Sequence, residues 1–178
     1  MSSKLYFYPL IKTEQKTNEN LSNTYPNIIK LFENFNLSHY EITQITDSIF
    51  LGNISGAMNC DLLKKNNIKY IVNCTKNIPN KCTDMIYYNI PIDDTYNQNI
   101  ENYFDPSYNF IEKSLENKDG NIFIHCHAGV SRSVTILVSY LMKKNNMTVI
   151  DAIRFIKNKR DIVNPNPDFR LALSNYMN

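Results

Sequence analysis

Long hydrophobic runs are absent from this sequence of 178 residues. No apolar stretch approaches the roughly 18 residues that a membrane-spanning helix needs. The first residues do not form a signal peptide pattern either, because their short apolar run is broken by Pro9. We therefore expect a soluble cytoplasmic protein without a membrane partner, and we leave open whether it also enters the nucleus.

Cysteine is scarce, with four residues at positions 60, 74, 82 and 126. No two of them have the CxxC spacing of a zinc or redox site, so we expect neither a metal nor a cofactor. The chain is also too long and too poor in cysteine for a small disulfide-stabilised scaffold, which makes a reducing compartment the default expectation.

An excess of charge of either sign is missing as well. The sequence has 19 Lys and Arg against 17 Asp and Glu, which gives a net charge of +2. The lysines are scattered, and no basic stripe interleaved with aromatic residues stands out. This balance argues against nucleic acid as a partner. The hydrophobic share of 43% is that of an ordinary globular protein with a core.

The chain divides into two parts by pattern. Residues 12–24 are polar and lack periodicity, which is typical of a linker. Apolar spacing in residues 28–35 predicts a short helix near 27–36. This helix either packs on the rest of the protein, which we favour, or serves as a docking element. We predict an N-terminal extension over residues 1–42 and a globular domain over residues 43–178.

Strands and helices alternate in the second part. Short β-branched and aromatic runs predict strands at 49–52, 70–73, 86–90 and 122–124. Apolar positions at helical spacing predict helices at 59–66, 99–117, 132–144, 148–158 and 168–177. Such alternation predicts an α/β fold with helices packed on a sheet that is at least partly parallel.

The segment His125-Cys126-His127-Ala128-Gly129-Val130-Ser131-Arg132-Ser133 lies between a predicted strand and a predicted helix. The N-terminus of a helix offers unpaired N–H groups and a positive dipole end, and a tight loop before it can gather further N–H groups around an anion. Gly129 permits the backbone angles of such a loop. We predict that residues 127–132 bind a phosphate and that the same field favours the nucleophilic thiolate of Cys126.

Two further side chains complete this loop. Arg132 follows Cys126 by six residues, so that the loop can return its planar guanidinium to hold two phosphate oxygens. Ser133 can donate a hydrogen bond to the sulfur and improve it as a leaving group. The alternative, a structural cysteine beside a chance arginine, does not explain the spacing, the internal glycine and the strand–loop–helix context together.

These residues resemble the signature of the protein tyrosine phosphatase superfamily, and specifically that of the dual-specificity phosphatases. The resemblance extends over residues 43–178, through the helix that follows Arg132, the early strands at 49–52 and 71–73, and the turn at Pro165-Asn166. It implies a central twisted, mostly parallel sheet of about five strands flanked by helices, and makes residues 43–178 a catalytic domain.

The resemblance also implies a general acid in the stretch Ile90-Pro91-Ile92-Asp93-Asp94-Thr95. The family pattern selects Asp94, and a carboxylic acid suits the task because the leaving oxygen must be protonated. Asp93 is the competitor, and the alternative role for both is to cap the following helix. The sequence has no tryptophan, so the Trp-Pro-Asp loop of tyrosine-specific relatives is missing.

The remaining candidates are given smaller roles. We expect His125 to point away from the pocket and to shape the loop by hydrogen bonding, and His127 to line the mouth or to face solvent. Some relatives protect the nucleophile with a disulfide, for which Cys74 is the candidate here. The other interpretation of Cys74, which we favour, is a buried inert thiol.

We therefore predict a protein phosphatase that hydrolyses phosphotyrosine and phosphoserine or phosphothreonine through a cysteinyl phosphate. Its catalytic residues are Cys126, Arg132, Asp94 and Ser133, and its partner is a phosphoprotein, with a protein kinase as one candidate. The alternatives are a phosphatase of a phosphoinositide, a glycan phosphate or an RNA 5′ end, and a catalytically weak module that binds phosphopeptides.

Overall fold

The structure is a computed structural model that describes residues 41–176. The predicted helix near 27–36 and almost all of the predicted extension over residues 1–42 lie outside the described residues, so both stay predictions. In the part of the chain that is described, no helix combines the length and the apolar character needed to cross a membrane.

A five-stranded sheet forms the centre of the domain, with the strand order β1-β2-β5-β3-β4. Its strands are β1 (Ile42–Gln44), β2 (Ile49–Gly52), β3 (Ile68–Asn73), β4 (Ile86–Asn89) and β5 (Asn121–His125). Strand β1 pairs antiparallel with β2, whereas the other three pairings are parallel. The predicted mostly parallel sheet of about five strands is confirmed.

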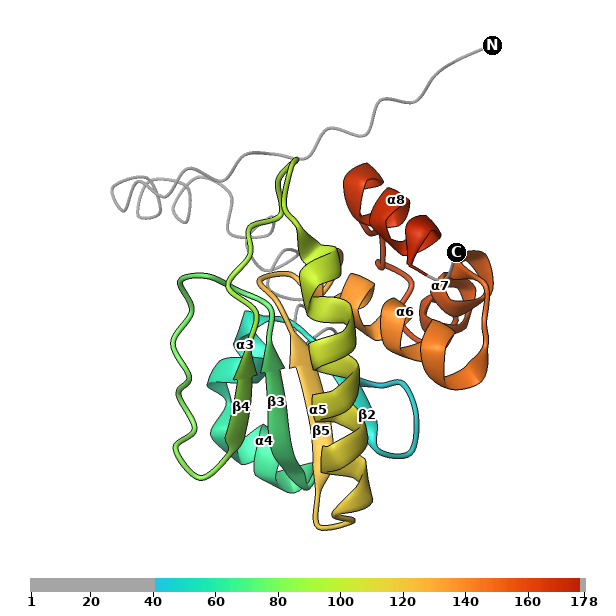
Figure 1. The fold of residues 1–178 in the computed structure, drawn as a ribbon. Coiled ribbons are helices and arrows are strands. Elements are labelled where there is room, and N and C mark those ends of the chain that lie inside the picture. The colour runs from blue at the N-terminus through green and yellow to red at the C-terminus, as the bar shows by residue number, and fades with distance from the viewer. Residues whose placement is uncertain (1–40, 177–178) are drawn as a thin grey trace, which may run out of the picture. The chain divides into compact units, whose positions relative to one another are not determined.

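Helices cover both faces of this sheet (Figure 1). One face carries α5 (Phe104–Glu116), α6 (Arg132–Asn145), α7 (Val149–Lys157) and α8 (Pro167–Asn175), and the other carries α3 (Ile54–Met58) and α4 (Cys60–Lys65). The strand side chains alternate accordingly. In β5, Ile122 and Ile124 pack in the larger core with α5 to α8, and Phe123 between them packs in the smaller core with α3 and α4.

Sequence periodicity located all the long elements, but it missed two short ones. Strand β1 has three residues and helix α3 has five, which is too short for a periodic signal. The helix predicted over 99–117 begins with a 3₁₀ turn, η2 (Ile100–Tyr103), and continues as α5. The alternative role of Asp93 and Asp94, capping of this helix, is not observed, since neither η2 nor α5 has a side-chain cap.

One disulfide differs from expectation. Cys60 at the start of α4 is bonded to Cys82 in the loop between β3 and β4, with a sequence separation of 22 residues. We predicted no disulfide framework from the cysteine count. Sequence spacing could not reveal this pair because the two residues meet only when the β3–β4 loop folds back against α4. The bond ties that loop to the body of the domain.

The parallel strands place their carboxyl ends at one edge of the sheet. Gly52 at the end of β2 and Asn73 at the end of β3 both lie opposite His125, the last residue of β5. The segments that follow β2, β3, β4 and β5 therefore converge there, as expected for an open parallel sheet. Cys126, the residue after β5, stands at the middle of this edge.

Candidate active site

The loop from His127 to Val130 turns its carbonyl groups outward. The carbonyl oxygen of His127 accepts from Ile54 N at 3.0 Å, and that of Val130 accepts from Asn164 N at 2.8 Å. The carbonyl oxygens between them accept from one arginine side chain, as described below. Because the N–H of a peptide unit points opposite to its carbonyl, the amides of residues 128–131 are directed to the inside of the loop. This is the anion-binding arrangement that the sequence predicts.

Gly129 is required for this backbone path. Its φ of 67° lies in the left-handed region, which glycine adopts without steric cost. An added Cβ would also lie 2.5 Å from the carbonyl oxygen of Gly52 and 2.4 Å from Nη2 of Arg160. The amide of Gly129 donates to Sγ of Cys126 at 3.2 Å, so the turn brings a loop N–H directly onto the sulfur.

Arg160 holds the outer side of the loop and was not identified from the sequence. Its side chain is buried, with 1% of the residue exposed. The guanidinium donates to Gly129 O at 2.8 Å, to Ala128 O at 3.1 Å and to Thr43 Oγ1 at 3.1 Å. Arg160 is therefore a positioning residue. In the sequence it stands in a charged run that is typical of a solvated surface, and this run gives no signal of burial.

Replacing Arg160 by alanine should destabilise the domain and weaken phosphate binding together. The substitution leaves two buried carbonyls without donors and removes a charged hydrogen-bond donor, which costs about 3 kcal/mol in the free energy of unfolding. Chemical denaturation and competitive inhibition by inorganic phosphate measure the two effects. Lys159→Ala, at the exposed neighbouring position, is the control. An Arg160→Ala variant as stable as the wild type would contradict this role.

Two donors converge on Sγ of Cys126. Besides the amide of Gly129, the hydroxyl of Ser133 lies at 3.2 Å from the sulfur, as the sequence suggested. Ser133 itself is fully buried in the first turn of α6. Both groups can donate to an anionic sulfur, which suits Cys126 to act as a nucleophile and later as a leaving group.

Cys74 lies at the end of β3 behind this sulfur. It is free and fully buried, and burial raises the pKa of its thiol, with the neighbouring Cys126 adding to the shift. A protonated, inaccessible thiol is a poor nucleophile. These properties agree with the interpretation of Cys74 as an inert buried residue, while its pairing with Cys126 on oxidation remains untested.

Arg132 reaches back over the loop, as its spacing predicts. One Nη donates to the carbonyl of Ile92 at 3.3 Å, which ties the side chain to the segment after β4. Its Nε is buried and has no hydrogen-bond partner among residues 41–176. A buried donor without an acceptor is costly, so the site is built to receive an oxyanion at this position.

The carboxylate of Asp94 is bound to the loop. Its Oδ1 accepts from Ser131 Oγ at 2.7 Å and from Asn166 Nδ2 at 2.8 Å, and its Oδ2 lies 3.7 Å from Nε of Arg132. Asn166 also donates its backbone N–H to Ser131 Oγ at 3.1 Å. The structure thus brings Asp94, Ser131 and Arg132 together, and it adds Asn166, which the sequence marked only as part of a turn.

Asp93 faces a different part of the mouth. It lines a hollow of about 230 Å³ with Thr75, Lys76, Asn77, Ile78, His127 and Arg132. Its Oδ2 lies 3.9 Å from Nζ of Lys76. The two neighbouring carboxylates therefore point to different partners, as expected for adjacent residues of an extended segment. His127 is exposed and lines this hollow, one of the two positions expected for it.

His125 is buried on the other side of the strand end, with 1% of the residue exposed. Its ring stacks on Phe123 with centroids 5.5 Å apart, and its Nδ1 lies 3.3 Å from the carbonyl oxygen of Cys126. Burial, assisted by the charge of Arg132, lowers the pKa of His125 from 6.5 to about 4. The ring is thus neutral at pH 7 and acts as a structural support for the loop, as predicted.

The lowered pKa of His125 predicts a loss of stability in acid. Since the unfolded state protonates near 6.5 and the folded state near 4, the unfolded state gains protons first as the pH falls. The free energy of unfolding should fall by about 3 kcal/mol between pH 7 and pH 4 through this group. Denaturation midpoints of the wild type and His125→Asn across this range measure it; parallel curves for the two proteins would contradict the prediction.

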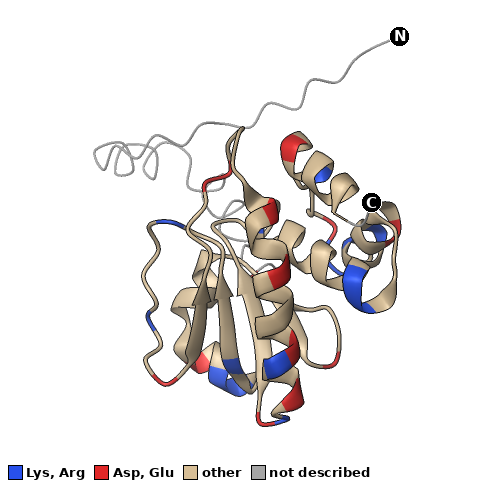
Figure 2. Ribbon diagram, viewed as in Figure 1, with Lys and Arg blue, Asp and Glu red and all other residues tan. Residues whose placement is uncertain are grey.

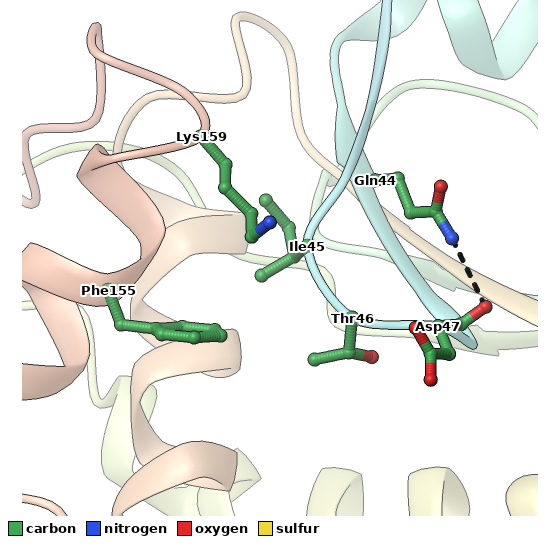
Figure 3. A pocket seen from close by; sticks show the side chains of 6 residues that line it. All are labelled: Gln44, Ile45, Thr46, Asp47, Phe155 and Lys159. Carbon is green, nitrogen blue, oxygen red and sulfur yellow. Dashed lines mark hydrogen bonds between the residues drawn. The ribbon is translucent and has the colours of Figure 1, made fainter.

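A larger hollow of about 450 Å³ lies elsewhere, between the β1–β2 connection and α7 (Figure 3). It is lined by Gln44, Ile45, Thr46, Asp47, Phe155 and Lys159. The side-chain amide of Gln44 donates to the carbonyl oxygen of Asp47 at 3.3 Å. None of the predicted site residues lines this hollow, whereas His127 and Arg132 line the smaller one at the carboxyl edge of the sheet.

Comparison with known proteins identifies the family to which this chain is similar. Residues 49–178 match the family described as "Dual specificity phosphatase, catalytic domain". The chain is 40% identical over 129 residues to dual specificity protein phosphatase 7 of Homo sapiens, a match that covers 71% of this chain and 30% of the human protein. It is 36% identical over 126 residues to dual specificity protein phosphatase 1 of Arabidopsis thaliana, covering 70% and 63% of the two chains.

Solved structures agree with this assignment. The crystal structure of DUSP15 superposes with a TM-score of 0.73 at 34% identity, covering 76% of this chain and 86% of that one. The human tyrosine phosphatase-like serine/threonine/tyrosine-interacting protein superposes with a TM-score of 0.70 at 30% identity, covering 76% and 94%. The matched region spans less than a third of the human phosphatase. With its five-stranded sheet, its cysteine loop and its matching residues 49–178, the chain belongs to the dual specificity phosphatase family.

Proposed function

We propose that this chain is a protein phosphatase that hydrolyses phosphotyrosine and phosphoserine or phosphothreonine through a cysteinyl phosphate. The observation that carries the proposal is the buried Nε of Arg132, a donor without a hydrogen bond among the described residues, beside a sulfur that accepts from two donors. Such a site fits a phosphate ester and a thiolate nucleophile together. Family membership supports the same activity.

In the first step, Sγ of Cys126 attacks phosphorus and the P–O bond to the substrate breaks. The amides of the loop and the guanidinium of Arg132 stabilise the charge on the three equatorial oxygens. Asp94 gives its proton to the leaving oxygen. Its place beside Arg132 and Ser131 supports this role, whereas Asp93 is directed to Lys76.

In the second step, water attacks the phosphocysteine. Asp94, now a carboxylate, accepts the proton of this water, and the phosphate leaves with the thiolate regenerated. The hydroxyl of Ser133, 3.2 Å from the sulfur, supports the departing thiolate. The expected partner is a phosphoprotein, and a protein kinase is one candidate.

Release of phosphate from p-nitrophenyl phosphate, a phosphotyrosine peptide and a phosphothreonine peptide tests the proposal. We expect turnover of all three, with none of it in Cys126→Ser. A wild type inert on all three would refute it and direct attention to phosphoinositide, glycan and RNA substrates. Binding of phosphopeptides without turnover would favour a binding module instead.

A further inference from the structure

A basic side chain borders the hollow opposite the acid segment. The loop between β3 and β4 contributes Thr75, Lys76, Asn77 and Ile78 to the hollow beside Arg132. Figure 2 shows basic segments along this loop and acidic ones on the segment that follows β4. Because Arg132 also lines this hollow, a substrate whose phosphate binds at Arg132 can extend over it. Lys76 is the basic residue that the β3–β4 loop contributes to the lining of this hollow.

The loop that carries Lys76 is tied to the end of β3 by side-chain hydrogen bonds. Asn73, which is 2% exposed, donates through its side-chain amide to Ile78 O at 2.9 Å and to Asn80 Oδ1 at 3.0 Å. Its own side-chain oxygen accepts from Thr75 Oγ1 at 2.6 Å. The bond of Cys82 to helix α4 secures the far part of the same loop. A preorganised wall loses little entropy on binding, so it suits recognition of a substrate.

The ammonium group of Lys76 makes only a weak ion pair with Asp93. Its Nζ lies 3.9 Å from Asp93 Oδ2, beyond hydrogen-bond distance, and the two side chains are 60% and 47% exposed. An exposed pair of this kind contributes little stability. A substrate carboxylate can therefore replace Asp93 as the partner of Lys76 at small cost. The hollow of about 230 Å³, which His127 and Thr75 also line, can accommodate such a group.

We propose that Lys76 selects phosphopeptides that carry an acidic residue close to the phosphorylated one. The proposal rests on the proposed function, because it takes the phosphate to bind at Arg132. It adds a specificity-determining residue outside the phosphate loop. The preferred substrates are peptides in which an Asp or Glu side chain reaches the hollow between Lys76 and Asp93.

Equilibrium binding to the full chain carrying Cys126→Ser tests this without depending on turnover. The probes are phosphotyrosine peptides that differ in one residue, which is Asp, Asn or Lys. This residue is placed in turn at each position near the phosphotyrosine, on its N-terminal and its C-terminal side. At the best position we expect the Asp peptide to bind roughly fivefold more tightly than the Asn peptide. The ratio of the Asp-peptide affinity to the Asn-peptide affinity should fall toward one in Lys76→Ala and persist in Lys76→Arg. In Lys76→Glu, the Lys peptide should bind more tightly than the Asp peptide.

The ratio of affinities separates recognition from a structural role. If Lys76 only positioned Asp93, its removal would weaken the Asp and Asn peptides equally and leave the ratio unchanged. Lys81→Ala is the matched control, because Lys81 lies in the same loop but donates to Met58 O at 2.9 Å, away from the hollow. A wild-type ratio near one at every position, or a ratio that survives in Lys76→Ala, would overturn the proposal. Failure of the phosphatase activity would appear separately, as absent turnover with p-nitrophenyl phosphate.

Discussion

Replacing Cys126 by serine should lower the phosphatase rate by about 10⁴-fold or more, the largest effect that we expect from a single substitution. The two donors at 3.2 Å from Sγ stabilise a thiolate, and an alcohol in the same position remains protonated near neutral pH. Because serine is nearly isosteric with cysteine and the loop is held from outside, the phosphate site should keep its shape. Initial rates on p-nitrophenyl phosphate measure the loss.

The second free cysteine gives the matched control. Cys74 is buried and its thiol is kept protonated by a raised pKa, so Cys74→Ala should retain most of the rate. Inorganic phosphate should still bind to Cys126→Ser, which shows that the loop is intact. A Cys126→Ser variant with a rate near that of the wild type would contradict the assignment of the nucleophile.

Replacing Arg132 by alanine should reduce kcat/KM by about 10³-fold, the second largest expected effect. Its side chain is mostly buried, 13% exposed, and Nε has no hydrogen-bond partner among the described residues. Loss of this side chain removes the donor that faces the equatorial oxygens in both steps. Arg132→Lys should recover only a small part of the rate, because an ammonium group lacks the planar fork.

Steady-state rates on a phosphotyrosine peptide provide the measurement for Arg132. Arg154→Ala is the control, because Arg154 is 65% exposed and pairs with its helix neighbour Asp151 at 2.9 Å. Its rate should match that of the wild type. If Arg132→Lys worked as well as the wild type, a point charge would suffice and the bidentate role would be wrong.

The sequence was sufficient for the parts of the site that are local in the chain. Cys126, Gly129, Arg132 and Ser133 lie within eight residues, and the physics of a helix N-terminus assigns each a place before any tertiary structure is known. The strands and long helices were predictable for a similar reason, since their apolar period is read over one continuous segment. The prediction of about five strands also required the family resemblance, and the order of the strands was not predicted.

The remaining parts depend on contacts between distant segments. Arg160 binds the loop from 31 positions away, and its charged sequence neighbours resemble a solvated surface. Asn166 meets Asp94 across 72 positions. The bond between Cys60 and Cys82 requires the β3–β4 loop to fold onto α4. Periodicity and composition report on none of these contacts, because each is created only when the sheet brings the segments to one edge.

The choice between Asp93 and Asp94 illustrates the same limit. The sequence favoured Asp94 through the family pattern alone, and the structure places its carboxylate 3.7 Å from Nε of Arg132. Asp93 points into the neighbouring hollow. The role of Asp94 as general acid stays a prediction that follows from this placement.

The most direct test of the central claim is to locate the phosphate during turnover. The wild type and Asp94→Asn are mixed with a phosphotyrosine peptide, quenched in acid within the first turnover and analysed by peptide mass spectrometry. We predict phosphate on Cys126, and more of it in Asp94→Asn, because the water of the second step then lacks its general base. Phosphate release with no phosphorylated Cys126 at any time, or with the phosphate on another residue, would contradict the cysteinyl phosphate mechanism.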